Sequence, residues 1–215
     1  MAILSESEAT DSADNAEPIP RAGAADPSVV SRCIPLLVVL LLLFSPAVVG
    51  TARAQSNDDE YRVKAAFIFH FAQLVDWPAD TLTVADNSLL ICTLGRDPFN
   101  GALESAVAGK AIGARVARVL HLKQSEDMKT CQILFFGAAQ LKHVPALVAD
   151  LRNAPVLTVG ETAGFLDAGG MICLLLKDSK VRFDVNLDAA QSANLKIGSR
   201  LLILAQSVTG ANRGK

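Results

Sequence analysis

Short apolar runs separated by helical segments constrain the fold of this chain most strongly. Four runs have the length and composition of buried strands: residues 89–94 (LLICTL), 114–122 (ARVARVLHL), 131–136 (CQILFF) and 156–159 (VLTV). Helical patterns or turn residues lie between them. Strands that alternate with helices favour a mostly parallel sheet with helices on both faces, a three-layer α/β domain. A flavodoxin-like strand order, second-first-third, would place run 89–94 between 114–122 and 131–136.

The last third of the chain has a different pattern. Residues 171–176 are apolar, 177–180 form a polar turn, and 181–187 alternate strictly between apolar and polar residues. This pattern predicts an antiparallel C-terminal hairpin at one edge of the sheet. Its outward side chains are expected to be Arg182, Asp184 and Asn186. A capping box of Asp188 and Gln191 then predicts a helix, and residues 201–208 a final one.

Residues 61–78 (YRVKAAFIFHFAQLVDWP) form the first expected helix of the domain, which Pro78 ends. Two of its sides are apolar, so it is either packed in the core or pressed against a partner. The broader stripe predicts a buried face made of seven residues: Val63, Ala66, Phe67, His70, Phe71, Leu74 and Val75. Phe69 lies on the second apolar side and is a candidate contact with a partner or a second copy. Trp77 is either an interface anchor or a packing residue.

The N-terminal 54 residues have the composition of segments that do not belong to the fold. Residues 1–30 are rich in Ala, Ser, Asp, Glu and Pro without periodicity, which indicates disorder or a start codon assigned too far upstream. Residues 31–54 contain Arg32, an apolar run over 34–49 and an Ala-Arg-Ala site at 52–54, as a secretory signal peptide does. We therefore expect cleavage after Ala54, export to the periplasm and a single domain over 55–215, with a retained N-terminal anchor as the alternative.

Charge and cysteine content narrow the possible partners and sites. Residues 1–54 hold three basic and six acidic residues, which leaves 17 Lys+Arg against 16 Asp+Glu in residues 55–215. A net charge near neutral without a basic block makes nucleic acid an unexpected partner. Three cysteines remain, and an odd number in an exported protein suggests one disulfide with one free thiol, or an intermolecular bridge. Cys92 and Cys131 fall in two strands that the predicted order makes neighbours, so they are the expected pair, with Cys173 as a buried free thiol.

No sequence pattern in the chain indicates a catalytic site, a cofactor site or a metal site. There is no G-x-S-x-G, H-E-x-x-H, P-loop or G-x-G-x-x-G sequence, and the three histidines are too scattered for a zinc site. We therefore predict a protein that is not an enzyme, with no catalytic residues, cofactor or metal ligands. Ligands in open α/β sheets lie at the carboxyl ends of strands. A candidate small-molecule crevice therefore lies at Gly95, Asp97, Gly160 and Glu161, although tight turns and capping explain the same residues.

Several motifs together resemble the YfiR-like family of periplasmic proteins over residues 60–208. They begin with the Tyr-Arg-Val-Lys-Ala-Ala-Phe helix that ends in Val-Asp-Trp-Pro, and continue with Gly-Arg-Asp-Pro-Phe after the first strand. Four later segments complete the set: VLTVGE at 156–161, GGMI at 169–172, RFDVNL at 182–187 and LLILA at 201–205.

The resemblance implies a periplasmic repressor that binds the periplasmic domain of an inner-membrane diguanylate cyclase and so lowers cyclic di-GMP and biofilm formation. It also implies an outer-membrane lipoprotein that sequesters the repressor, and a compact α/β fold that tends to form a homodimer. Cys92 and Cys131 match the positions of a family disulfide, whereas Cys173 matches one half of a second bridge whose partner cysteine is absent. The expected partner is this cyclase or another membrane sensor. The alternative hypothesis is a periplasmic small-molecule binding module that serves a sensor kinase or a transporter.

Overall fold

A computed structural model describes residues 50–78, 87–123, 125, 127–140 and 142–210. The predicted disorder of residues 1–30 and the apolar run at 34–49 lie outside these residues, as does most of the predicted signal peptide. Within the described residues, none of the helices combines the length and apolar character that crossing a membrane requires.

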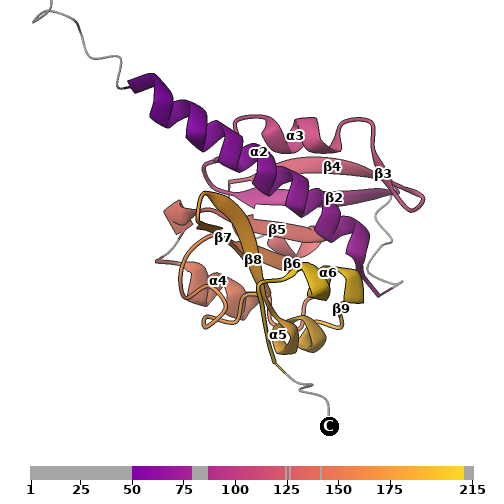
Figure 1. Cartoon of the computed structure of the whole chain (residues 1–215). Coiled ribbons are helices and arrows are strands. Elements are labelled where there is room, and N and C mark those ends of the chain that lie inside the picture. The colour runs from indigo at the N-terminus through magenta and orange to yellow at the C-terminus, as the bar shows by residue number, and fades with distance from the viewer. Residues whose placement is uncertain (1–49, 79–86, 124, 126, 141, 211–215) are drawn as a thin grey trace, which may run out of the picture. The chain divides into compact units, whose positions relative to one another are not determined.

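The main sheet has eight strands in the order β10-β8-β7-β6-β5-β2-β4-β3 (Figure 1). Its strands, in chain order, are β2 (Ser88–Leu94), β3 (Ala111–Ile112), β4 (Arg115–Leu122), β5 (Ile133–Phe136), β6 (Leu157–Gly160), β7 (Ile172–Lys177), β8 (Lys180–Asn186) and β10 (Ser207–Thr209). The neighbouring strands β4, β2, β5, β6 and β7 pair in parallel. Strands β7 and β8 form an antiparallel hairpin. The α/β class and the predicted second-first-third order, here β4-β2-β5, are confirmed.

Helices cover both faces of this sheet, which confirms the three-layer architecture. The helices are α2 (Gly50–Leu74), α3 (Ala102–Val107), α4 (Val144–Asp150), α5 (Leu187–Ser192) and α6 (Ser199–Leu204), with short 3₁₀ turns η2 (Met128–Thr130) and η3 (Ala138–Gln140). Alternate side chains of β5 point to opposite faces: Ile133 and Phe135 pack with α2 and α3, and Leu134 and Phe136 pack with α4. Successive residues of β5 thus belong to two different apolar cores, one on each face of the sheet.

Helix α2 crosses one face of the sheet, and its buried side differs from the predicted stripe (Figure 1). Seven residues of α2 and of the position directly after it are buried: Lys64, Ala65, Ile68, Phe69, Phe71, Ala72 and Val75. The predicted stripe was wrong for Val63, which is 45% exposed, and for Ala66 and His70, which are also exposed. Because the helix is apolar on two sides, periodicity alone did not determine which side faces the sheet.

Beyond α2, two short antiparallel strands fix the end of that helix to the C-terminal part of the chain. β1 (Val75–Asp76) pairs with β9 (Lys196–Ile197), and the Gly198 amide donates to the Leu74 carbonyl at 2.8 Å. The sequence patterns did not predict this two-stranded sheet.

Helix α3 begins at Ala102 after Gly101, whose φ is 83°. Helix α4 begins at Val144 with Pro145 in its first turn. Two other helix ends differ from the predictions. The cap of α5 is Asn186, whose side chain accepts from the Ala189 amide at 3.1 Å, rather than an Asp188 box. The predicted final helix ends at Leu204, and β10 follows it and lies outside β8 at the sheet edge.

Candidate functional site

The carboxyl ends of β2, β5 and β6 meet at the edge of the sheet where the sequence placed a ligand crevice. Gly95 follows β2 with a φ of 79°, which an L side chain rarely adopts, and a Cβ there would collide with the Gln140 side chain. Gly160 ends β6, and a Cβ there would collide with the Phe165 ring. Both glycines are therefore required by turn geometry and packing, whether or not a ligand is present.

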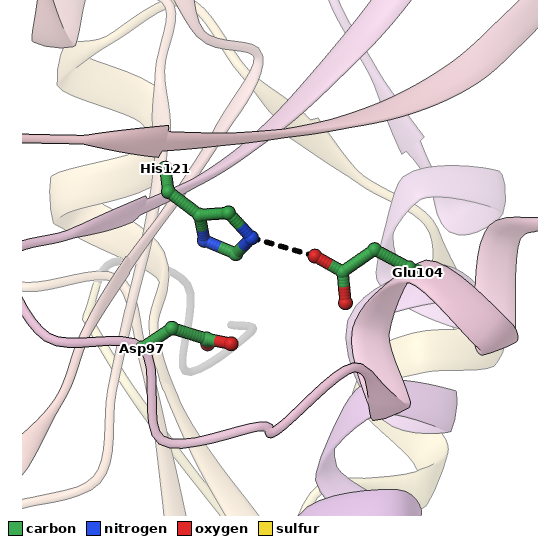
Figure 2. Close-up of side chains that lie close together, drawn as sticks. All are labelled: Asp97, Glu104 and His121. Carbon is green, nitrogen blue, oxygen red and sulfur yellow. Dashed lines mark hydrogen bonds and ion pairs between the residues drawn. The ribbon is translucent and has the colours of Figure 1, made fainter.

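Asp97 lies in the turn after β2, where its Oδ1 accepts from the Phe99 amide at 3.1 Å. Its carboxylate faces Glu104 of α3 and His121 of β4, as Figure 2 shows. His121 Nε2 and Glu104 Oε1 are 2.6 Å apart. The sequence patterns indicated Asp97 as a candidate site residue but neither of these neighbours.

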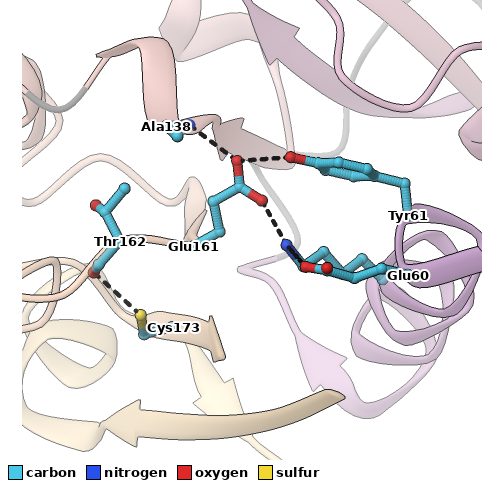
Figure 3. Close-up of polar contacts among 7 residues, drawn as sticks. Glu60, Tyr61, Ala138, Glu161, Thr162 and Cys173 are labelled. Atoms are coloured by element: carbon cyan, nitrogen blue, oxygen red, sulfur yellow. Dashed lines mark hydrogen bonds and ion pairs between the residues drawn. The ribbon is translucent and has the colours of Figure 1, made fainter. Parts of the chain in front are cut away.

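Glu161, at the end of β6, is the polar centre of this end of the sheet (Figure 3). Its side chain is only 5% exposed, and its Oε1 accepts from the Tyr61 hydroxyl at 3.1 Å and from the Ala138 amide at 2.8 Å. Its Oε2 accepts from Lys64 Nζ at 2.6 Å. Both carboxylate oxygens are thus used within the chain, and they hold α2 and η3 against β6.

Lys64 and Tyr61 of α2 complete this buried network. The Lys64 ammonium also pairs with Glu60 at 2.5 Å and lies 4.6 Å from the centre of the Tyr61 ring. Burial, and then the Glu161 carboxylate, raise the pKa of the Tyr61 hydroxyl well above its ordinary value, so that the hydroxyl remains a donor. A buried charge needs such partners, because an unpaired one is costly in a low-dielectric interior. The candidate crevice is therefore filled by side chains of α2 on its Glu161 side.

The predicted disulfide is present between Cys92 and Cys131, with a Cα–Cα distance of 6.0 Å, and Cys173 is a buried free cysteine. Cys92 belongs to β2 and Cys131 lies two residues before β5, so the bridge joins neighbouring parallel strands. In the chain-entropy model a bridge of this loop length stabilises by about 4 kcal/mol. Disulfides of this kind persist in oxidising compartments such as the periplasm.

The five residues predicted to face a partner do not form one exposed surface. Phe69 of α2 is 7% exposed and belongs to the core between this helix and the sheet. The prediction that Phe69 contacts a partner was therefore wrong. Trp77 is half-buried and donates through Nε1 to the Gln132 carbonyl at 3.2 Å. Asp184 and Asn186 are half-buried, whereas Arg182 is exposed.

Arg182 lines a groove of about 630 Å³ between the middle of α2 and the β7–β8 hairpin. Val63 and Leu176 line the same groove and are 45% and 55% exposed. Asp59 and Glu60 lie on the α2 side, and Lys180 lies with Arg182 on the hairpin side. Exposed apolar side chains in a hollow with charged margins are typical of protein-binding surfaces.

Comparison with known proteins identifies the family. The model of the YfiR/HmsC-like family matches residues 61–206. The chain belongs to the YfiR/HmsC-like family. The matched residues include the disulfide, Tyr61, Lys64 and Glu161, so the buried network lies within the family domain. The family is regulatory rather than catalytic. It is also periplasmic, in agreement with the disulfide of this domain.

Two solved structures are similar to the chain at low identity. One is a conserved domain protein from Vibrio cholerae, with 9% identity, a TM-score of 0.47 and coverage of 67% of this chain and 60% of that one. The other is an ABC domain from Streptococcus pneumoniae in complex with L-Trp, with 10% identity, a TM-score of 0.43 and coverage of 60% and 57%. The chain thus spans less than two thirds of either structure, and the TM-scores are too low to bear on function.

Proposed function

We propose that this protein is a periplasmic negative regulator that binds the periplasmic domain of an inner-membrane diguanylate cyclase. Binding would hold the cyclase inactive, lower cyclic di-GMP and so reduce biofilm formation. The observation that carries the proposal is membership of the YfiR/HmsC-like family over residues 61–206. Sequestration by an outer-membrane lipoprotein and formation of a homodimer are parts of the same proposal.

The structure supports contact with a protein better than uptake of a small ligand. Glu161, one of the two acidic residues of the candidate crevice, already accepts three hydrogen bonds from within the chain. A small molecule at that position would have to displace a buried ion pair, at a cost of several kcal/mol. The hypothesis of a small-molecule binding module is therefore the weaker one.

We place the cyclase contact at the groove between α2 and the β7–β8 hairpin. Val63 and Leu176 supply exposed apolar area, and Arg182 supplies a charge at the margin. Arginine is among the residue types enriched in the small set of contacts that carries most of the affinity of an interface.

Co-purification from membranes tests this placement. Tagged wild-type protein, Arg182→Glu and Arg152→Glu would be expressed with their own signal sequence in the native bacterium and recovered with cross-linked membrane partners. Arg152 is also exposed but follows α4 and does not line this groove, so its reversal is the matched control. We expect wild type and Arg152→Glu to recover a diguanylate cyclase, and Arg182→Glu to recover at least about tenfold less. Equal recovery by both variants would contradict the placement, and no cyclase with wild type would contradict the partner.

A further inference from the structure

Asp97, Glu104 and His121 come from three different elements and converge at the carboxyl end of β4 (Figure 2). One ligand-type atom of each residue lies within 4.8 Å of those of the other two. The side chains remain reachable from solvent, because those of His121 and Glu104 are 42% and 43% exposed. None of the three takes part in the Glu161 network or lines the groove of the proposed cyclase contact.

We propose that these three residues bind one divalent transition-metal ion, of the class of Zn²⁺. Two carboxylates and one neutral imidazole carry a total charge of −2, which balances a 2+ ion. An imidazole ligand favours zinc and its transition-metal neighbours, whereas magnesium and calcium prefer oxygen ligands. Three protein ligands would leave a coordination position for water or for a group from another molecule.

The geometry needs only local adjustment to accept such an ion. Zinc–nitrogen and zinc–oxygen distances near 2.0–2.2 Å in a tetrahedral site separate two ligand atoms by about 3.4 Å. His121 Nε2 and Glu104 Oε1, at 2.6 Å, would therefore move apart by less than about 1 Å. Asp97, whose atom lies within 4.8 Å of both, would approach by about 1.5 Å at most, through a side-chain rotation in a turn.

A second observation points to a cation at the same position. Glu104 Oε2 is buried and, among the described residues, has no hydrogen-bond partner. A buried carboxylate oxygen without a partner is costly, because it has lost water and gained nothing in exchange. A metal ion bound by Glu104 would satisfy that charge.

Thr93 holds the His121 ring in the orientation that a metal ligand needs. Its hydroxyl lies 2.7 Å from His121 Nδ1, and the residue is only 1% exposed in β2, directly opposite His121 in the strand pairing. A hydroxyl both donates and accepts, so Thr93 can accept from Nδ1–H when Nε2 binds metal and donate to Nδ1 when it does not. Metal-binding histidines almost always have such a partner on the other ring nitrogen. Thr93 is therefore a positioning residue of the site.

Zinc titration of the purified, disulfide-bonded protein tests the proposal. The affinity tag would be removed, the protein treated with a chelator and dialysed, and ZnCl₂ binding measured by calorimetry for wild type, Glu104→Gln, His121→Gln, Thr93→Val and His70→Gln. His70 is the matched control, since it is an exposed histidine of α2 that bonds only to the neighbouring Gln73 among the described contacts. Thermal unfolding without metal would establish that each variant is folded.

We expect wild type and His70→Gln to bind one Zn²⁺ per chain with the same affinity. Glu104→Gln and His121→Gln should bind at least about tenfold more weakly, and Thr93→Val about 10- to 100-fold more weakly with one zinc still bound at saturation. The proposal is overturned if wild type binds no Zn²⁺ at 100-fold molar excess, which would leave a plain His–Glu hydrogen bond. It is equally overturned if Glu104→Gln and His121→Gln bind zinc as tightly as wild type does. The same holds if His70→Gln weakens zinc binding as much as those two substitutions do. Because cyclase binding is not measured, failure here leaves the proposed regulatory function intact.

Discussion

Folding opposes the ionisation of the Cys173 thiol. The residue is 3% exposed in β7, and its Sγ donates to the Thr162 carbonyl at 3.4 Å. Burial, and then the nearby Asp184 carboxylate, raise the pKa of the thiol from 9.0 to about 11. The unfolded chain ionises this thiol near pH 9 and the folded chain only near pH 11. Its contribution to stability is therefore complete below pH 9 and is lost as the pH rises toward 11.

Replacing Cys173 with Ala should remove this pH-dependent component. Between pH 8 and pH 10.5 we expect the free energy of unfolding of wild type to fall by roughly 2 kcal/mol more than that of Cys173→Ala. Other groups that titrate in this range, including Tyr61, contribute to both proteins and cancel in the comparison. Urea denaturation at a series of pH values, without reductant, provides the measurement. Parallel curves for the two proteins would mean that the thiol is not held neutral by the fold.

At the scale of elements, the docking of α2 on the sheet depends on one buried cation. Lys64 and Glu161 are each 5% exposed at the side chain and are 97 positions apart in the chain, so their ion pair joins α2 to β6. Arg62, two positions before Lys64, pairs with Asp59 at 3.0 Å with both side chains more than 60% exposed. The same helix thus carries one buried and one solvated ion pair.

These two pairs should respond very differently to the loss of the cation. Lys64→Met leaves the Glu161 carboxylate buried beside Tyr61 without its counter-charge, and we expect a loss of about 3–5 kcal/mol in the free energy of unfolding. Arg62→Met should change that free energy by less than about 0.5 kcal/mol. Chemical denaturation of both variants at neutral pH provides the comparison. Similar small losses in the two variants would show that Glu161 does not depend on Lys64.

The strands were predicted from the sequence much better than the packing of α2. Runs such as LLICTL and CQILFF are almost entirely apolar because both faces of their strands are covered, and this pattern indicates a central parallel sheet. The orientation of α2 could not be read in the same way, because Lys64 is buried only through Glu161, a residue far along the chain. The short strand β10 was predicted as helix since its exposed Ser-Val-Thr sequence is ordered by pairing with β8, a contact that local pattern does not encode.

The candidate sites also divide into those that the sequence predicted and those that only the packing of the elements revealed. The bridge between Cys92 and Cys131 was predictable, because strand order brings two cysteines of apolar strands together. The trio of Asp97, Glu104 and His121 was not, since the spacing of these residues matches no ligand motif and only the packing of α3 beside β4 unites them. The crevice at Gly160 and Glu161 was located at the correct end of the sheet, but nothing local indicated that α2 would fill part of it.

At the scale of the whole molecule, the domain presents two distinct regions. One end of the sheet is closed by α2 through the Glu161 network, whereas the groove beside the β7–β8 hairpin leaves apolar side chains in contact with solvent. A protein that acts by contact requires the second feature and does not require an open ligand crevice. This arrangement, together with family membership, is the basis of the proposed regulation of a membrane cyclase.

Intracellular cyclic di-GMP in the native bacterium tests that central claim most directly. The gene would be deleted and complemented with wild type, Arg182→Glu or Arg152→Glu, with periplasmic levels of each protein matched by immunoblot. We predict that deletion raises cyclic di-GMP several-fold, that wild type and Arg152→Glu restore the original level, and that Arg182→Glu does not. An unchanged cyclic di-GMP level in the deletion strain would contradict the proposed function.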